Sequence, residues 1–227
     1  MTERATPSVD GLVIGILGGT GDQGRGLARR FALAGHQVII GSRSPERAAV
    51  AAQEIGHGVQ GRANADAARG ASVVIAAVPW EGHGDLLSGL AAELAGKIVV
   101  DCVNPLGFDQ RGAYALPVAE GGPAEGSAAQ QAAALLPGSR VVAAFHHVSA
   151  VLLLDPEVDT IDLDVMVLGD DREATDLVQA LAARIPGVRG IYAGRLRNCG
   201  QIEALTANLV SINRRYKAHA GLRVTDI

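Results

Sequence analysis

A glycine-rich segment that directly follows an apolar run constrains the fold of this chain more than any other feature. Residues 12–17 read LVIGIL, and residues 15–26 carry six glycines. Glycine inside a helix or strand costs roughly 0.5–1 kcal/mol relative to alanine, so such a run needs a backbone reason. Gly19, Gly21 and Gly24 form a G-x-G-x-x-G between an expected strand and an expected helix, the context in which this pattern binds a dinucleotide. A plain glycine turn is the alternative.

Each glycine of this pattern has a distinct role in a dinucleotide-binding loop. Gly19 would make the tight turn, Gly21 would let the backbone approach a pyrophosphate, and Gly24 would let the helix pack closely on the strand. Free N–H groups and the helix dipole at the start of the helix favour an anion. The residues expected to bind the cofactor here are Gly19, Thr20, Gly21, Asp22, Gln23 and Gly24.

Short, almost wholly apolar runs alternate with Ala-rich helical stretches from Leu12 onward. Strands that are covered on both faces of a parallel sheet have this pattern. The helix after the loop ends before Gly35, and Ser44 with Pro45 opens the next one. The alternation predicts an α/β fold with a Rossmann-type doubly wound parallel sheet. The expected strands are residues 12–17, 37–40, 72–78, 97–101 and 140–145.

The pattern changes twice in the second half of the chain. Residues 107–126 have no period and are dense in Gly and Pro, which predicts a long loop that acts as a lid or binding loop. We expect two domains, a dinucleotide-binding Rossmann domain at 1–147 and a small C-terminal α+β lobe at 148–227. The elements expected in the lobe are a strand at 162–170, a helix at 171–185, a strand at 187–194 and a helix at 201–219.

The end of the second expected strand indicates which dinucleotide binds. An enzyme that uses NAD places an Asp or Glu there to hold the ribose 2′-hydroxyl, but this chain has no acid at that position. Arg43 can pair with a 2′-phosphate, and Ser42 can donate a hydrogen bond to it. Arg47 lies in the first turn of the next helix, where a bound anion would offset its unfavourable interaction with the dipole. These residues predict NADP; the alternative is that both arginines are solvated surface residues.

The sequence shows little acid–base or metal chemistry. It has no HExxH pattern and no Cys/His cluster, so we expect no metal site. Lys97 stands at the start of a strand and Lys217 near the end of the last helix, both away from the expected cleft. His146 and His147 follow the fifth strand at the cleft edge, where one could donate a proton or hydrogen-bond a polar ring, or both could be structural. Hydride transfer between two cofactors needs few such groups.

Composition limits the expected binding partners and cellular compartment of the protein. The net charge of −4 and the absence of a basic run argue against nucleic acid, and no long apolar run indicates a membrane span. Two cysteines and a polar N-terminus favour a reducing cytoplasm.

One apolar helical face either forms a homodimer interface or docks the lobe on its own domain. That face consists of Leu205, Leu209, Ile212 and Tyr216.

Three segments give the chain a resemblance to a known family. They are GGTGDQGRGLARRFALAGHQVIIGSR (18–43), VPWEG (78–82) and FHHV (145–148). Together they resemble the NADPH-dependent reductases of coenzyme F420, the 8-hydroxy-5-deazaflavin carrier of archaea and actinobacteria. The resemblance implies a cytoplasmic enzyme that transfers a hydride reversibly between NADP(H) and F420. It also implies that the C-terminal lobe closes a cleft in which the deazaflavin lies against the nicotinamide.

The resemblance also assigns roles to particular residues. The family's contacts to the 2′-phosphate fall on Thr20, Ser42, Arg43 and Arg47, and its histidine after the fifth strand falls on His146, the one candidate catalytic residue. His147 departs from the family pattern. Further cofactor contacts are expected from Val78, Pro79 and Trp80, although a lone Trp also suits a core or an interface.

Two other functions fit the same residues. One is an NADPH-dependent reductase of a small imine or keto acid, and the other is a non-catalytic NADP(H)-sensing protein. The N-terminal domain also resembles that of membrane-bound metalloreductases, whose transmembrane part has no counterpart in this sequence.

Overall fold

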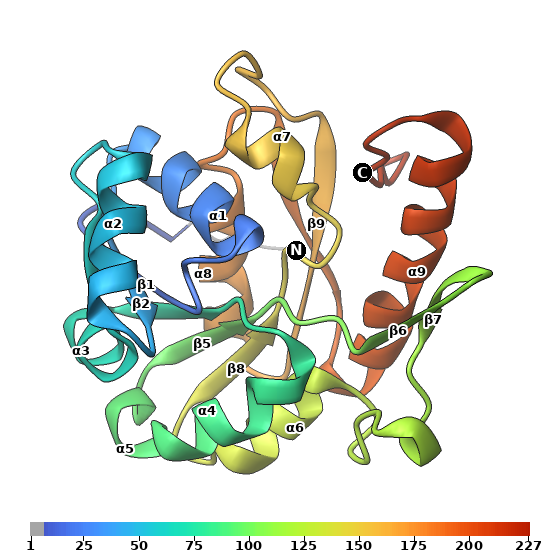
Figure 1. The fold of residues 1–227 in the computed structure, drawn as a ribbon, viewed down its shortest axis with the longest axis horizontal. Coiled ribbons are helices and arrows are strands. Elements are labelled where there is room, and N and C mark those ends of the chain that lie inside the picture. The colour runs from blue at the N-terminus through green and yellow to red at the C-terminus, as the bar shows by residue number, and fades with distance from the viewer. Residues whose placement is uncertain (1–6) are drawn as a thin grey trace.

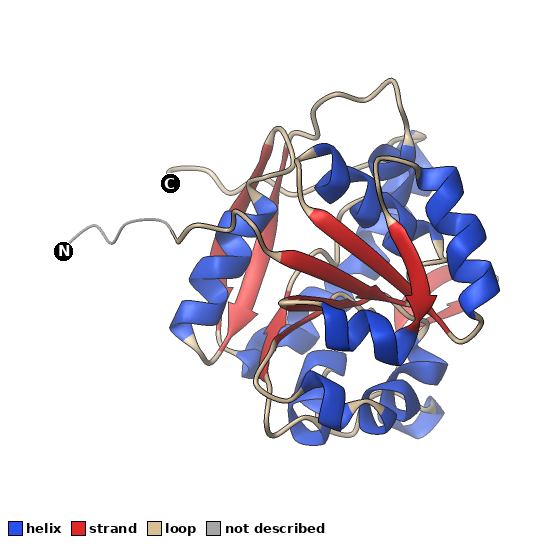
Figure 2. Cartoon of the chain, turned by 90° about the vertical axis from the view of Figure 1, so that its left-hand side faces the viewer, coloured by secondary structure: helices blue, strands red, loops and turns tan. Residues whose placement is uncertain are grey.

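The computed structural model describes residues 7–227 and is built on an eight-stranded sheet with helices on both faces (Figures 1 and 2). The strands are Val13–Leu17 (β1), Gln37–Ser42 (β2), Gln60–Ala63 (β3), Val73–Ala76 (β4), Ile98–Asp101 (β5), Arg140–Ala143 (β8), Leu163–Gly169 (β9) and Val188–Gly194 (β10). Their order in the sheet is β10-β9-β8-β5-β4-β1-β2-β3. β1 to β5 and β8 run parallel, whereas β9 and β10 run the other way. The predicted doubly wound parallel sheet is confirmed.

Two hydrophobic cores lie on the two faces of the sheet. The helices are Asp22–Leu33 (α1), Pro45–Ile55 (α2), Asn64–Gly70 (α3), His83–Gly89 (α4), Ala91–Leu94 (α5), Ala128–Leu135 (α6), Ala150–Leu154 (α7), Arg172–Ala182 (α8) and Cys199–Tyr216 (α9). α1, α2, α7 and α8 cover one face, and α3 to α6 cover the other. No helix among the described residues is both long and apolar enough to cross a membrane.

The prediction of a long loop at 107–126 is wrong for the first part of that segment. Leu106–Asp109 (β6) and Gly112–Ala115 (β7) form an antiparallel hairpin. One carboxylate oxygen of Asp109 accepts the N–H groups of Arg111 and Gly112, which closes the turn. Both strands are short and much of the hairpin is exposed. The sequence therefore lacks the alternation of apolar and polar residues that would have predicted strands there.

The C-terminal part of the chain continues the main sheet. β9 pairs with β8 across the expected boundary after residue 147, and α9 stands beside the sheet with the β6–β7 hairpin next to it (Figure 1). The Arg30 guanidinium on α1 donates to the carbonyls of Leu152 and Leu153, at 2.6 and 2.9 Å. These contacts join the two sides of the boundary, and the division into two domains stays a prediction.

Candidate functional site

The glycine-rich segment that leads from β1 into α1 is packed so closely that neither Gly19 nor Gly24 has room for a side chain. A Cβ on Gly19 would lie 2.6 Å from the Ile40 Cβ, and a Cβ on Gly24 would lie 2.7 Å from the Gly19 Cα. The Gly19 N–H donates to the Gly41 carbonyl at 3.0 Å, which fastens the loop to β2. The loop therefore has the tight turn and the close helix packing that the sequence predicts.

Gly21 differs from these two glycines because its surroundings are open. Apart from its chain neighbours, the only atom of the described residues within 4 Å of a Cβ added there is the Gly18 carbonyl oxygen, at 3.8 Å. Gly21 is the N-cap of α1, and no side chain caps the N–H groups of the first turn. Open space beside uncapped N–H groups suits an anion such as a pyrophosphate. The residues present thus fit the phosphate part of a dinucleotide.

A cleft of about 330 Å³ opens beside this loop at the carboxyl ends of the parallel strands. Its walls come from four places: the start of α1 and the segments after β4, β5 and β8. This is the place where open α/β sheets bind ligands. The lining residues are Gly21, Asp22, Gln23, Ala77, Val78, Pro79, Trp80, Cys102, Val103, Asn104 and His146.

His146 is the polar side chain in this lining with the most unusual surroundings. Its exposed fraction is 5%, and neither ring nitrogen has a hydrogen-bond partner among the described residues. Burial lowers the pKa of His146 to about 4, so the ring is neutral at pH 7 and offers one donor and one acceptor. Unpaired buried polar groups are rare in proteins. The unpaired ring in the cleft wall fits a ligand with polar ring substituents.

The backbone before His146 explains how this side chain reaches the cleft. Phe145 has a φ of +66°, which is unusual for a bulky residue. Its carbonyl accepts a hydrogen bond from the Gln23 side chain at 3.3 Å, and its ring packs edge-on against Phe31. The glycine-loop helix therefore helps to hold the turn that presents His146.

His147 contacts α9 and does not line the cleft. Its Nε2 donates to the Ile202 carbonyl at 3.0 Å. Asn104, which lines the cleft, donates to the His146 carbonyl at 3.1 Å and accepts from the Thr206 hydroxyl at 3.1 Å. These contacts fasten the C-terminal helix to the cleft wall.

Two exposed arginines follow β2, Arg43 in the turn and Arg47 in the first turn of α2. Arg43 and Arg47 form no ion pair within residues 7–227, whereas nearby Arg25 is paired with Glu54 at 2.8 Å. Thr20 and Arg47 line a second hollow, of about 340 Å³, but Arg43 is outside its lining. The buried Ser42 hydroxyl accepts the Ser44 N–H at 3.3 Å and keeps its own hydrogen free to donate. The contacts of these residues with a 2′-phosphate stay predictions.

The sequence analysis missed part of the cleft wall. Cys102, Val103 and Asn104 directly follow β5, so the rule that ligands lie at the carboxyl ends of parallel strands could have identified them. Trp80 lines the cleft, as expected, and its indole N–H donates to the Gly121 carbonyl at 2.8 Å. No group of three or more His, Cys, Asp or Glu side chains within the described part of the chain could hold a metal ion.

Comparisons with known proteins point to one family. A family model described as NADP oxidoreductase, coenzyme F420-dependent, matches residues 13–105. The chain is 40% identical to the F420-dependent NADP reductase of Methanothermobacter marburgensis, over 94% of this chain and 98% of that protein. It is 39% identical to the reductase of the same name from Methanocaldococcus jannaschii, over 94% and 98%.

A solved structure gives the same result. The crystal structure of a proposed F420-dependent NADP reductase from Arthrobacter sp. FB24 matches with a TM-score of 0.81 and 28% identity, over 95% of this chain and all of that one. The chain therefore belongs to the family of F420-dependent NADP reductases.

Proposed function

We propose that this protein is an NADP-dependent oxidoreductase that transfers a hydride reversibly between NADP(H) and coenzyme F420. The observation that carries the proposal is one cleft lined by both the phosphate-binding loop and the unpaired ring of His146. Membership of the family supports it.

The residues of the chain bind and align the two substrates. The start of α1 would hold the pyrophosphate, and Arg43 and Arg47 with Thr20 and Ser42 would hold the 2′-phosphate. The nicotinamide and the deazaflavin supply the redox chemistry themselves. The neutral His146 would hydrogen-bond the deazaflavin without giving up a proton.

We expect both substrates to bind at once, because none of the described residues that line the cleft can carry a hydride between the two rings. Deuterium placed on C4 of NADPH should therefore appear at C5 of the deazaflavin, and double-reciprocal plots should intersect. Loss of the visible absorbance of oxidised F420 follows the reaction. Ping-pong kinetics, or deuterium lost to water, would contradict direct transfer. An imine or keto acid reductase would instead oxidise NADPH only with those substrates, and a sensor would bind NADPH without turnover.

Arg43→Ala should weaken NADP binding by about 1.5–3 kcal/mol, the scale of a hydrogen bond to a charged group. NAD binding should stay nearly the same, since NAD lacks the 2′-phosphate. Titration with both cofactors measures the difference, and Arg111→Ala, which removes an exposed arginine on the hairpin, is the control. Equal losses for NADP and NAD would show that Arg43 does not contact the 2′-phosphate.

His146→Ala should raise the KM for F420 or lower turnover while NADP binding stays intact. The reason is that the ring is unpaired in the cleft wall, so its removal breaks no internal hydrogen bond. Steady-state kinetics and NADPH titration measure the two effects. A variant that unfolds, as judged by circular dichroism, would show a structural role instead.

We also propose that the protein works in the cytoplasm as a homodimer and binds only small-molecule partners, with no nucleic acid or membrane. The C-terminal end of α9 supports the homodimer, because Ile212 and Tyr216 are 40% and 72% exposed there. Leu209, earlier on the same helical face, is buried within the chain. Sedimentation of the purified protein at twice its mass of 23.3 kDa would agree with a dimer.

A further inference from the structure

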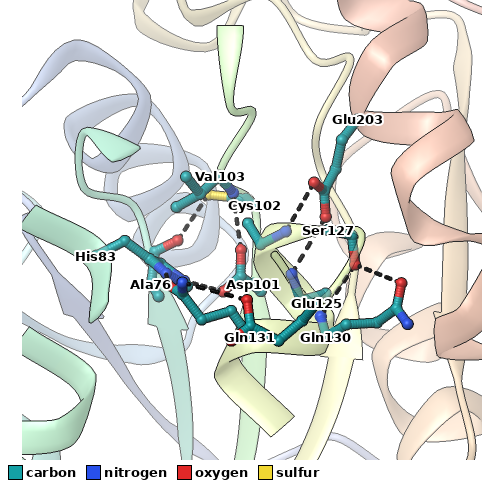
Figure 3. Close-up of polar contacts among 12 residues, drawn as sticks. Ala76, His83, Asp101, Cys102, Val103, Glu125, Ser127, Gln130, Gln131 and Glu203 are labelled. Atoms are coloured by element: carbon teal, nitrogen blue, oxygen red, sulfur yellow. Dashed lines mark hydrogen bonds and ion pairs between the residues drawn. The ribbon is translucent and has the colours of Figure 1, made fainter. Parts of the chain in front are cut away.

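A buried ion pair lies behind the cleft and has no part in the function proposed so far. His83, the first residue of α4, and Asp101, the last residue of β5, both have fully buried side chains, and the His83 Nε2 is 2.6 Å from an Asp101 carboxylate oxygen (Figure 3). A buried pair of this kind is costly to form, so its presence calls for a reason.

The contacts of His83 are those expected of a positively charged ring. Its Nδ1 lies 3.0 Å from the Gln131 side-chain oxygen, while the Gln131 amide nitrogen faces Glu125 at 3.5 Å. Both ring nitrogens thus face oxygen acceptors, which requires a proton on each. Burial lowers the pKa of His83, but the hydrogen bond and the charge of Asp101 outweigh burial and raise the pKa above its usual value.

The ion pair touches two walls of the cleft. The second carboxylate oxygen of Asp101 accepts the Val103 N–H at 3.0 Å, and Val103 lines the cleft. On the other side, the His83 ring lies 5.5 Å from the Trp80 ring with a tilt of 31°, within the range of a cation–π contact. Trp80 also lines the cleft and binds the Gly121 carbonyl.

We propose that the charged His83 is a positioning residue, which fixes the Trp80 wall and the Val103 wall relative to each other so that the two reacting rings align. The proposal rests on the proposed function, because it takes this cleft to be the place where the two rings meet. His83 touches neither substrate and acts only through Asp101 and Trp80.

Three carboxyl groups surround His83. Asp101 on β5 makes the direct contact, Glu125 acts through Gln131, and Glu203 on α9 lies further off. Glu203 is occupied by two other groups, since it accepts the N–H groups of Ala128 and Ala129 at 2.8 and 3.2 Å. A change at Asp101 is therefore the most direct way to remove the charge of His83.

Asp101→Asn removes the charge while keeping the hydrogen bonds. The new amide oxygen still accepts the Val103 N–H, and the amide nitrogen donates to the His83 Nε2, so His83 becomes neutral. Trp80 is the only tryptophan of the chain, and a neighbouring imidazolium quenches indole fluorescence. In the absence of substrates, the fluorescence of Trp80 should rise with pH as His83 loses its proton. In the variant this rise should occur about 1–3 pH units lower than in wild type. Identical titrations in wild type and variant would overturn the charged His83.

The kinetic part of the test separates positioning from stability. In Asp101→Asn we expect kcat to fall about tenfold to a hundredfold, since misalignment by about 1 Å has effects of this order. The KM for NADPH should change much less, because the phosphate contacts lie elsewhere. The high-pH inflection in kcat should move down together with the fluorescence titration, whereas inflections from the substrates are common to both proteins. An unchanged kcat would overturn positioning, and so would a loss that merely follows the unfolded fraction.

Two more variants complete the experiment. Asp85→Asn, which neutralises an exposed carboxylate on the same helix, should match wild type in both measurements. If Asp101→Asn does not fold, His83→Gln replaces it, and its Trp80 fluorescence should lose the pH dependence; persistence of that dependence would overturn the proposal. If the wild type fails to reduce F420 at all, the proposed function fails and the positioning role with it, although the titration still decides whether His83 is charged.

Discussion

Gly21→Val should abolish detectable NADP binding while the protein stays folded. Gly21 has φ −81° and ψ 164°, extended values that valine adopts without strain. Beyond its chain neighbours, one atom of the described residues lies within 4 Å of the added Cβ, at 3.8 Å, so the fold has room for the side chain. The branched side chain would instead occupy the space beside the first N–H groups of α1. We expect at least a hundredfold loss of affinity, about 2.7 kcal/mol, measured by NADPH titration.

Two other glycines make this prediction specific. Gly89→Val places a side chain in equally open space on α4, away from the cleft lining, and should leave NADP binding unchanged. Gly24→Val should instead destabilise the protein, because its Cβ would lie 2.7 Å from the Gly19 Cα. Wild-type affinity in Gly21→Val, with a normal circular dichroism spectrum, would mean that the pyrophosphate binds somewhere else.

The buried parallel strands could be predicted from the sequence because burial on both faces leaves an unbroken apolar run. The run at 12–17 became β1 at Val13–Leu17, and the run at 97–101 became β5 at Ile98–Asp101. β3 (Gln60–Ala63) was missed, because it is an edge strand in which no residue is fully buried. Its sequence, QGRA, has no apolar run to detect.

The loop and its neighbours were predictable for a different reason. Gly19, Gly21 and Gly24 follow from local backbone geometry, which a fixed spacing records in the sequence. Local sequence patterns could not show which of two adjacent histidines faces the cleft, because that depends on the positive φ of Phe145, and only the family resemblance singled out His146. The pair of His83 and Asp101 depends on how α4 approaches β5, and a tertiary contact of this kind leaves no local pattern in the sequence.

The second large expected effect concerns Glu203, whose buried carboxyl group should make the stability of the protein depend on pH. Its side chain is 2% exposed, and its carboxyl group accepts the first N–H groups of α6 (Figure 3). Burial raises the pKa of Glu203 to about 7, although the two N–H groups oppose the shift. Because the folded pKa is above the unfolded value, this group's contribution to stability is complete below about pH 4.3 and is lost as the pH rises through about 7.

Glu203→Gln should therefore change how stability depends on pH. Each carboxylate oxygen of Glu203 accepts one N–H group, so glutamine keeps an acceptor for only one of the two, and it carries no charge. The lost acceptor lowers stability by an amount that does not depend on pH, whereas the stability of the variant relative to wild type should rise by up to about 3 kcal/mol from pH 5 to pH 8. Urea unfolding at both pH values measures the gain, with Glu173→Gln, an exposed glutamate on α8, as control. The comparison with wild type cancels the opposite contribution of His146, whose lowered pKa makes stability rise over about pH 4 to 6.5. A stability difference between variant and wild type that does not vary with pH would mean that the two N–H groups keep Glu203 ionised. The permanent charge of Glu203 would then join α9 to the N-terminus of α6.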